Sequence, residues 1–113
     1  MKPKSLDSTN TVTRVVHCQK EPYDILIGRP SRWGNPFSHL DHSAAEFKVA
    51  TRDEACDMYF VWLKEQIALG NISKEDILAL DKKTLGCYCS PNRCHGSEII
   101  KMINIIKMEE FYD

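Results

Sequence analysis

The chain has 113 residues, which is enough for one small domain with one hydrophobic core. Hydrophobic residues make up 42% of it and charged residues 27%, a balance typical of a folded globular protein and not of a disordered one. The formal net charge of −1 gives no general attraction to nucleic acid or to an anionic membrane. Any basic site must therefore be local, and nucleic acid is not a favoured partner.

No apolar run approaches the roughly 20 residues that span a bilayer, and Met1–Asn10 lacks the apolar stretch of a signal peptide. We therefore expect a cytoplasmic protein with no membrane partner. The odd number of cysteines, five, argues against a disulfide framework in such a chain. Residues 1–10 are polar and predict a flexible tail, and residues 11–113 predict a single domain.

The first predicted elements are two strands and a loop. Residues rich in β-branched side chains predict a strand over Thr11–Cys18, and an apolar run predicts a second over Tyr23–Ile27. Gly28 ends the second strand, and the glycine- and proline-rich segment Gly28–Phe37 follows as a loop. Residues 39–45 are expected to be irregular, with a short strand at 46–49 after them.

Two helices follow. Thr51 and Glu54 form a T-x-x-E pattern, which is typical of a helix start, and Gly70 supplies the stop. Ser73 is expected to cap a second, shorter helix. The apolar positions recur at helical spacing, so one face of the first helix should pack on the sheet. That face is Ala55, Met58, Tyr59, Trp62, Leu63 and Ile67.

A strand over Thr84–Cys89 and a helix from Gly96 or Ser97, with an apolar face that includes Met108, complete the order. A strand reached from an earlier strand through helices is a crossover connection, which favours parallel pairing. The predicted fold is therefore α/β, a single small domain in which a short sheet with a parallel pair carries helices on its faces. Ligands of such sheets bind at the carboxyl ends of the strands. Gly28–Phe37 and the residues after Cys89 both lie there, so we expect them to build one shared site.

Three cysteines and a histidine lie close together in the second of these segments, at Cys87, Cys89, Cys94 and His95. Three thiolates and an imidazole are the ligand set of a Cys₃His zinc site, although the C-x-C-x₄-C-H spacing departs from the usual paired C-x₂-C pattern. In an extended strand, Cys87 and Cys89 would point to the same face. Zinc is the one cofactor that the pattern could hold.

Two other interpretations of this segment stay open. A cysteine in the first turn of a helix has its pKa lowered by the helix dipole, and Cys94 lies there between Arg93 and His95. Cys94 would then be a nucleophile and His95 its acid/base partner. In the third interpretation the cysteines are buried core residues. His95 and Ser97 then cap a helix whose amides bind an anionic group of a ligand.

The loop Gly28–Phe37 has the composition of a ligand loop. Arg29 and Arg32 offer planar groups suited to phosphate or carboxylate, Trp33 offers a face for a base or sugar, and Asn35 an amide. The alternative is that Trp33 plugs the core and that the arginines are merely solvated. The candidate ligand-binding residues are Arg29, Ser31, Arg32, Trp33, Asn35, Arg93 and Ser97.

Residues 23–37, 51–55 and 85–96 together resemble a family of small bacterial and bacteriophage proteins described as domain of unknown function 4326. The resemblance covers about residues 12–108. The resemblance implies that the two motif segments belong together. It also implies a location in a bacterium or a phage-infected host cell, and it implies no particular activity. The chain departs from the family's pattern in the longer stretch His39–Ala45, where His39 and His42 are expected in an exposed loop.

The leading functional hypothesis is a domain that binds a small anionic, nucleotide-like ligand, with Arg29, Arg32 and Arg93 on the charged part and Trp33 on the flat part. If the domain is an enzyme, a hydrolase or transferase acting on a nucleoside or nucleotide through Cys94 is expected. Two alternatives remain. One is a zinc-stapled Cys₃His structural or interaction module, and the other is a phage protein that sequesters a nucleotide signal without turnover.

Overall fold

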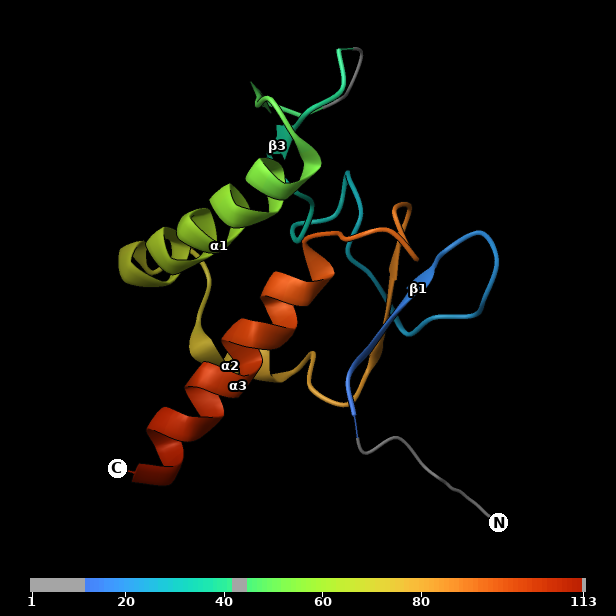
Figure 1. Cartoon of the computed structure of the whole chain (residues 1–113). Coiled ribbons are helices and arrows are strands. Elements are labelled where there is room, and N and C mark those ends of the chain that lie inside the picture. Colours follow the sequence, from blue (N-terminus) through green and yellow to red (C-terminus); the bar gives the residue numbers. More distant parts are fainter. Residues whose placement is uncertain (1–11, 42–44, 113) are drawn as a thin grey trace.

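A parallel sheet of three strands organises the computed structural model, which describes residues 12–41 and 45–112 (Figure 1). Its strands are β1 (Arg14–His17), β2 (Ile25–Leu26) and β5 (Thr84–Cys87), in the order β1-β5-β2. The predicted α/β class and the parallel pairing are confirmed. The predicted tail at 1–10 and His42 lie outside the described residues.

The middle strand, β5, is buried along its whole length. Leu85 lies opposite Val15 of β1 and opposite Ile25 of β2, so β5 carries the hydrogen bonds of both neighbours. A short apolar strand covered on both sides is what the run Thr-Leu-Gly-Cys favours. The strand ends at Cys87, two residues earlier than predicted, and the chain after it turns towards the last helix.

A second, smaller sheet pairs β3 (Phe37–Ser38) with β4 (Phe47–Lys48), again in parallel. The strand predicted at 46–49 is confirmed as β4, whereas β3 forms where the sequence predicts a loop and includes Phe37. The rings of Phe37 and Phe47 stack with their centroids 5.3 Å apart. This contact joins the two strands, and β3 packs against the first long helix.

Helix α1 (Arg52–Leu69) begins and ends where the sequence predicts. The Thr51 hydroxyl accepts a hydrogen bond from the Glu54 N–H at 3.0 Å, and the Glu54 carboxylate accepts one from the Ala50 N–H at 2.9 Å. Gly70 ends the helix in the left-handed region, with φ of 82°, where a residue without Cβ is favoured.

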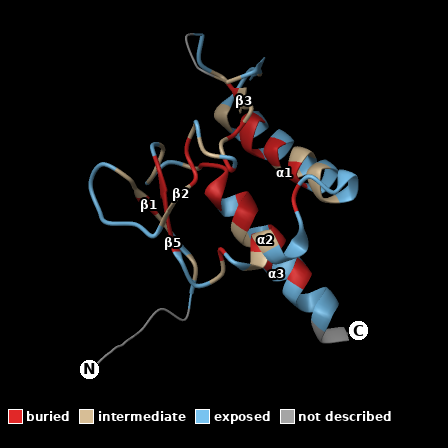
Figure 2. Ribbon diagram, turned by 180° about the vertical axis from the view of Figure 1, so that it is seen from behind, coloured by how far each residue is buried: buried red, intermediate tan, exposed pale blue. Residues whose placement is uncertain are grey.

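Helices α2 (Lys74–Leu78) and α3 (Gly96–Tyr112) complete the fold. Ser73 and Asp76 form a reciprocal capping box at the start of α2. Buried residues gather where α1, α2 and α3 meet one another and the sheet (Figure 2). The predicted apolar faces are correct at Tyr59 and Leu63 and wrong at Met58 and Met108, which are exposed. None of the described helices is long and apolar enough to cross a membrane.

Candidate functional site

The two predicted segments face one pocket of about 280 Å³ at the carboxyl ends of β2 and β5. The expectation that these segments lie together is therefore confirmed. The loop after β2 contributes Arg29 and Asn35, strand β3 contributes Phe37, and the loop after β5 contributes Tyr88, Cys89, Asn92, Arg93, Cys94 and His95. The remaining lining residues are Ser38, His39, Leu40, Arg52, Ala55, Cys56 and Cys87.

The pocket lining is positively charged. Arg29, Arg52 and Arg93 line it, and no aspartate or glutamate does so within the described ranges. Neither Arg29 nor Arg52 has a carboxylate partner among those residues. In a chain of net charge −1, this pocket concentrates positive potential at one place.

Arg29 is held in the pocket by its own loop. Its Nη1 donates to the backbone carbonyl of Asn35 at 2.6 Å. A Cβ at Gly34 would lie 2.9 Å from the Arg29 Cγ, so glycine is required for this close packing.

Asn35 is buried, and its side chain binds protein groups. Its Nδ2 donates to the Ala55 carbonyl at 3.0 Å, and its Oδ1 accepts from the Phe37 N–H at 2.9 Å. The amide predicted to meet a ligand therefore fastens the loop to α1.

Arg32 and Arg93 contact carboxylates. Arg32 does not line the pocket, is exposed, and lies 3.4 Å from Asp76. Arg93 lies 3.0 Å from Asp53, 2.9 Å from Asp57 and 3.1 Å from Glu98. Hydrogen bonds to these carboxylates raise the pKa of Arg93. The sequence predicts that both guanidinium groups meet a ligand, whereas in the fold helix residues supply one acidic partner to Arg32 and three to Arg93.

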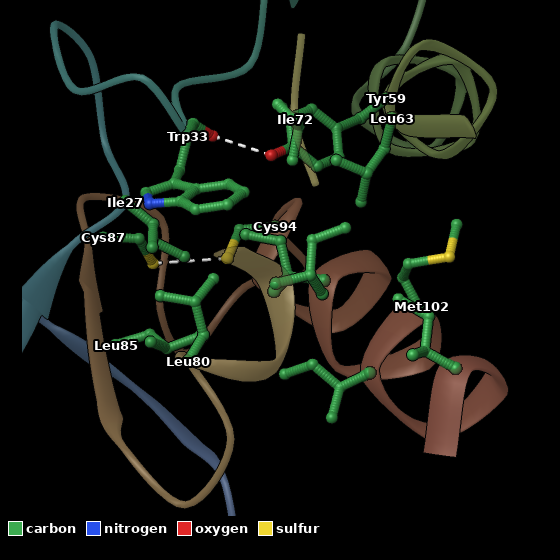
Figure 3. Packing of buried hydrophobic residues seen from close by; sticks show 14 residues of the cluster. Ile27, Trp33, Tyr59, Leu63, Ile72, Leu80, Leu85, Cys87, Cys94 and Met102 are labelled. Atoms are coloured by element: carbon green, nitrogen blue, oxygen red, sulfur yellow. Dashed lines mark hydrogen bonds between the residues drawn. The ribbon is translucent and has the colours of Figure 1, made fainter. Parts of the chain in front are cut away.

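Trp33 is a core residue with 6% of its surface exposed, as the alternative interpretation held. Its ring packs beside Ile27 and the two sulfurs of Cys87 and Cys94, and its carbonyl accepts a hydrogen bond from the Tyr59 hydroxyl at 2.9 Å (Figure 3). Trp33 does not line the pocket, so the expectation that it stacks on a ligand there is wrong.

The two serines proposed as ligand contacts also lie outside the pocket lining. The Ser97 hydroxyl lies 2.9 Å from the carbonyl of Cys94 and 2.9 Å from a carboxylate oxygen of Glu98, so it binds the first turn of α3. The Ser31 hydroxyl is buried and has no hydrogen-bond partner among the described residues.

The hydrogen bond between the two neighbouring thiols favours negative charge on Cys87 and not on Cys94. The Cys94 thiol donates to the Cys87 sulfur at 3.3 Å, and the Gly96 N–H donates to the Cys94 sulfur at 3.3 Å. The hydrogen bond from Cys94, supported by N–H groups of Cys89 and Ser90, holds the pKa of Cys87 well below its ordinary value. Donation to Cys87 and burial raise the pKa of Cys94, against the expectation from its position at the helix start.

His95 is buried and fastens the start of α3 to the end of β2. Its Nε2 donates to the Ile27 carbonyl at 2.7 Å, and the Tyr59 ring lies with its centroid 4.8 Å away. Burial lowers the pKa of His95 to about 4, although hydrogen bonding to Ile27 and Trp33 acts in the opposite direction. At neutral pH the ring is therefore uncharged and its Nε2 proton is bound to the backbone.

The zinc interpretation finds no support in this arrangement. Within residues 12–41 and 45–112, no group of three or more histidine, cysteine or acidic side chains is placed to hold a metal ion. Because β5 ends at Cys87, Cys89 lies beyond the strand, and the strand alternation on which the expectation for the two cysteines relied does not reach Cys89. We assign no metal ligand to the described residues.

Four further lining residues could contact a ligand and are not predicted from the sequence: His39, Arg52, Cys56 and Tyr88. Arg52 follows the Thr51 cap. The capping pattern predicts where the helix starts, but it does not predict that the Arg52 side chain faces the pocket. Tyr88 lies between Cys87 and Cys89, whose spacing suggests a metal or thiol site and not an aromatic one. It is 52% exposed, and its ring lines the pocket.

Comparison with known proteins gives the same two segments a family context. The model of the family described as domain of unknown function 4326 matches residues 12–105. A curated protein of Enterobacteria phage T4, described as an uncharacterized 12.4 kDa protein in the nrdA-td intergenic region, is 29% identical over 104 residues. That alignment covers 92% of this chain and 89% of the phage protein. No solved structure matches the chain.

Proposed function

Because the chain belongs to the family described as domain of unknown function 4326, whose description specifies no activity, we propose its function from the pocket itself. The protein binds a small anionic, nucleotide-like ligand at the carboxyl ends of β2 and β5. One observation carries this proposal. Arg29 and Arg52 line a pocket to which no described carboxylate contributes, and neither pairs with an acidic side chain among the described residues.

The charged part of the ligand is assigned to these two arginines. A guanidinium presents several N–H donors in one plane, which suits phosphate or carboxylate oxygens. Arg29 uses one of these donors on the Asn35 carbonyl, and this hydrogen bond preorganises the group for an anion. Arg52 comes from the first turn of α1, so the ligand would bridge the loop and the helix.

The flat part of the ligand is assigned to Tyr88, in place of Trp33. Its ring is half exposed and lines the pocket. A Cβ at Gly28 would lie 2.9 Å from Tyr88 Cδ2, so the ring packs closely over the start of the ligand loop. Aromatic rings stack on nucleobases without needing a particular base, which supports a nucleotide-like class and leaves the base unspecified.

Binding without turnover is the form of the proposal that the geometry supports. A hydrolase or transferase would need Cys94 as nucleophile and His95 as acid/base. The Cys94 thiol, however, donates its proton to the Cys87 sulfur, and His95 Nε2 donates its proton to the Ile27 carbonyl. A protein that sequesters a nucleotide signal needs only the pocket. We place this activity in the cytoplasm of a bacterium or of a phage-infected host cell, in line with the phage T4 relative.

Thermal unfolding of the full chain tests the proposal directly. We would measure the midpoint with inorganic phosphate, a nucleoside, and a panel of nucleoside mono-, di- and triphosphates, and measure affinity by calorimetry. At least one nucleotide should raise the midpoint of the wild type. Arg52→Gln should weaken its binding by roughly 1.5–3 kcal/mol for each charged hydrogen bond lost, with little change in the midpoint of the ligand-free protein.

Arg14→Gln is the matched control, because Arg14 is an exposed arginine of β1 outside the pocket lining. The proposal is wrong if no anion stabilises the wild type. It is also wrong if Arg14→Gln and Arg52→Gln weaken binding equally, since that result would indicate general charge attraction. Stabilisation by the nucleoside alone would reject the role of the arginines.

A further inference from the structure

Two buried thiols touch at the inner wall of the pocket. The sulfurs of Cys87 and Cys94 lie 3.3 Å apart and point toward each other (Figure 3). Both residues line the pocket. Cys87 ends β5 and Cys94 lies two residues before the start of α3, so the contact joins the two ends of the loop that carries Tyr88, Cys89 and Arg93. A buried cysteine that only fills space needs no second sulfur beside it.

The hydrogen bonds around the pair give the two sulfurs different chemistry. Cys94 donates its proton toward Cys87 and itself accepts from the Gly96 N–H at the start of α3. Negative charge is therefore favoured on the Cys87 sulfur, and the pKa of Cys87 lies below its ordinary value for this reason. Because a thiolate is the reacting form of cysteine, Cys87 would react first and Cys94 second.

We propose that Cys87 and Cys94 form a peroxide-reactive dithiol. Its oxidation joins the two residues by a disulfide bond at the inner wall of the pocket. This inference goes beyond ligand binding and does not depend on it. The oxidant is a small hydroperoxide, because Cys87 is 1% exposed and a bulky disulfide could not align its sulfur–sulfur bond with so buried an atom.

The reaction balances in two steps. The Cys87 thiolate attacks one oxygen of the hydroperoxide. A sulfur–oxygen bond forms, the oxygen–oxygen bond breaks, and the released alkoxide or hydroxide takes a proton from water. Cys87 is then a sulfenic acid. The Cys94 thiol gives up its proton, and its sulfur attacks the Cys87 sulfur. The disulfide bond forms, the sulfur–oxygen bond breaks, and hydroxide leaves with that proton as water. The thiols lose two electrons, and the hydroperoxide gains them.

The geometry required for the second step is nearly present. The sulfurs must approach from 3.3 Å to the ~2.0 Å of a disulfide bond. The other pocket cysteines lack this arrangement. Burial raises the pKa of Cys56 to about 11, and no hydrogen bond of the Cys89 thiol is found among the described residues.

The experiment uses the full, reduced chain with no anion added, so its outcome is separate from that of the binding tests. Hydrogen peroxide is added in small excess, and the products are followed by intact mass and by peptide mapping under non-reducing conditions. The wild type should lose the mass of two hydrogen atoms and yield a Cys87–Cys94 crosslinked peptide. A reducing agent should restore the starting mass.

Two variants separate the roles of the sulfurs, and a third is the control. Cys94→Ser should stop at Cys87 sulfenic acid, heavier by one oxygen atom and trapped by dimedone. Cys87→Ser should react at least about tenfold more slowly, because the thiolate has been removed. Cys56→Ser, in the same pocket, should behave as the wild type. A wild-type product that pairs other cysteines, or oxygen added without a crosslink, would overturn the proposal whether or not the variants fold.

Discussion

His95 shows how a single buried residue makes the stability of this protein depend on pH. Its pKa is lowered by burial to about 4, whereas the ring titrates near 6.5 in the unfolded chain. Between these values the unfolded chain binds a proton that the folded protein does not. Lowering the pH through this window therefore favours unfolding. The positive charge of Arg29 lowers the pKa of His95 further.

We expect the free energy of unfolding to fall by up to roughly 3 kcal/mol as the pH is lowered from about 6.5 to 4. Urea unfolding at a series of pH values measures it. His95→Gln keeps an N–H that can donate to the Ile27 carbonyl and removes the titration, so most of this pH dependence should disappear. His39→Gln, on the pocket wall, is the control and should keep it. An unchanged slope in His95→Gln would contradict the assignment.

Sequence reasoning at this scale found which residues are chemically unusual but not which partners they meet. The run around Arg29 and the run around Cys94 were correctly placed at one pocket. The partners of Arg93 and Trp33 are not predictable in this way. Asp53, Glu98 and Tyr59 lie on helices, and sequence patterns do not specify how those helices pack. A guanidinium suited to phosphate is equally suited to a carboxylate of its own chain.

At the scale of elements, Arg93 ties α1 to α3. It contacts Asp53 and Asp57 on α1 and Glu98 on α3, and Glu98 is only 3% exposed. Arg93→Met should lower the free energy of unfolding by roughly 1–3 kcal/mol, because a buried carboxylate loses a charged partner. Thermal and urea unfolding at neutral pH measure the loss.

Arg32→Met is the matched control for this tie. Arg32 also pairs with a carboxylate, but both side chains are well exposed, and such pairs contribute about 1 kcal/mol or less. Equal losses in the two variants would show that the burial of Glu98 does not matter. The opposite order would place the tie between α1 and α3 elsewhere.

The helices were predictable because their ends carry local chemistry. Thr51, Ser73 and Gly70 act through their own hydrogen bonds or backbone angles, so the pattern and the cause lie in the same few residues. Strand β3 has only two residues and exists because β4 pairs with it, which no local signal reveals. The end of β5 at Cys87 is set in the same way, by where its neighbours β1 and β2 stop.

At the scale of the whole molecule, Trp33 joins the loop between β2 and β3 to the core. The ring packs in the buried cluster, and the Tyr59 hydroxyl holds its carbonyl on α1. Trp33→Ala should lower the free energy of unfolding by roughly 3–5 kcal/mol. Trp62→Ala, which removes the same side chain from a partly buried position, should cost clearly less. Urea unfolding of both variants measures the difference, and equal losses would contradict the core role of Trp33.

The order β1-β5-β2 has a consequence for how the protein emerges from the ribosome. The two edge strands are synthesised early, and the strand that lies between them comes much later. Arg14 pairs with Thr84, and Ile25 with Leu85. A nascent chain that ends before Thr84 therefore holds two strands with no partner, and pairings so distant in sequence form slowly. The sheet can close only after Thr84–Cys87 has left the exit tunnel, and the pocket at its carboxyl ends can form only after that.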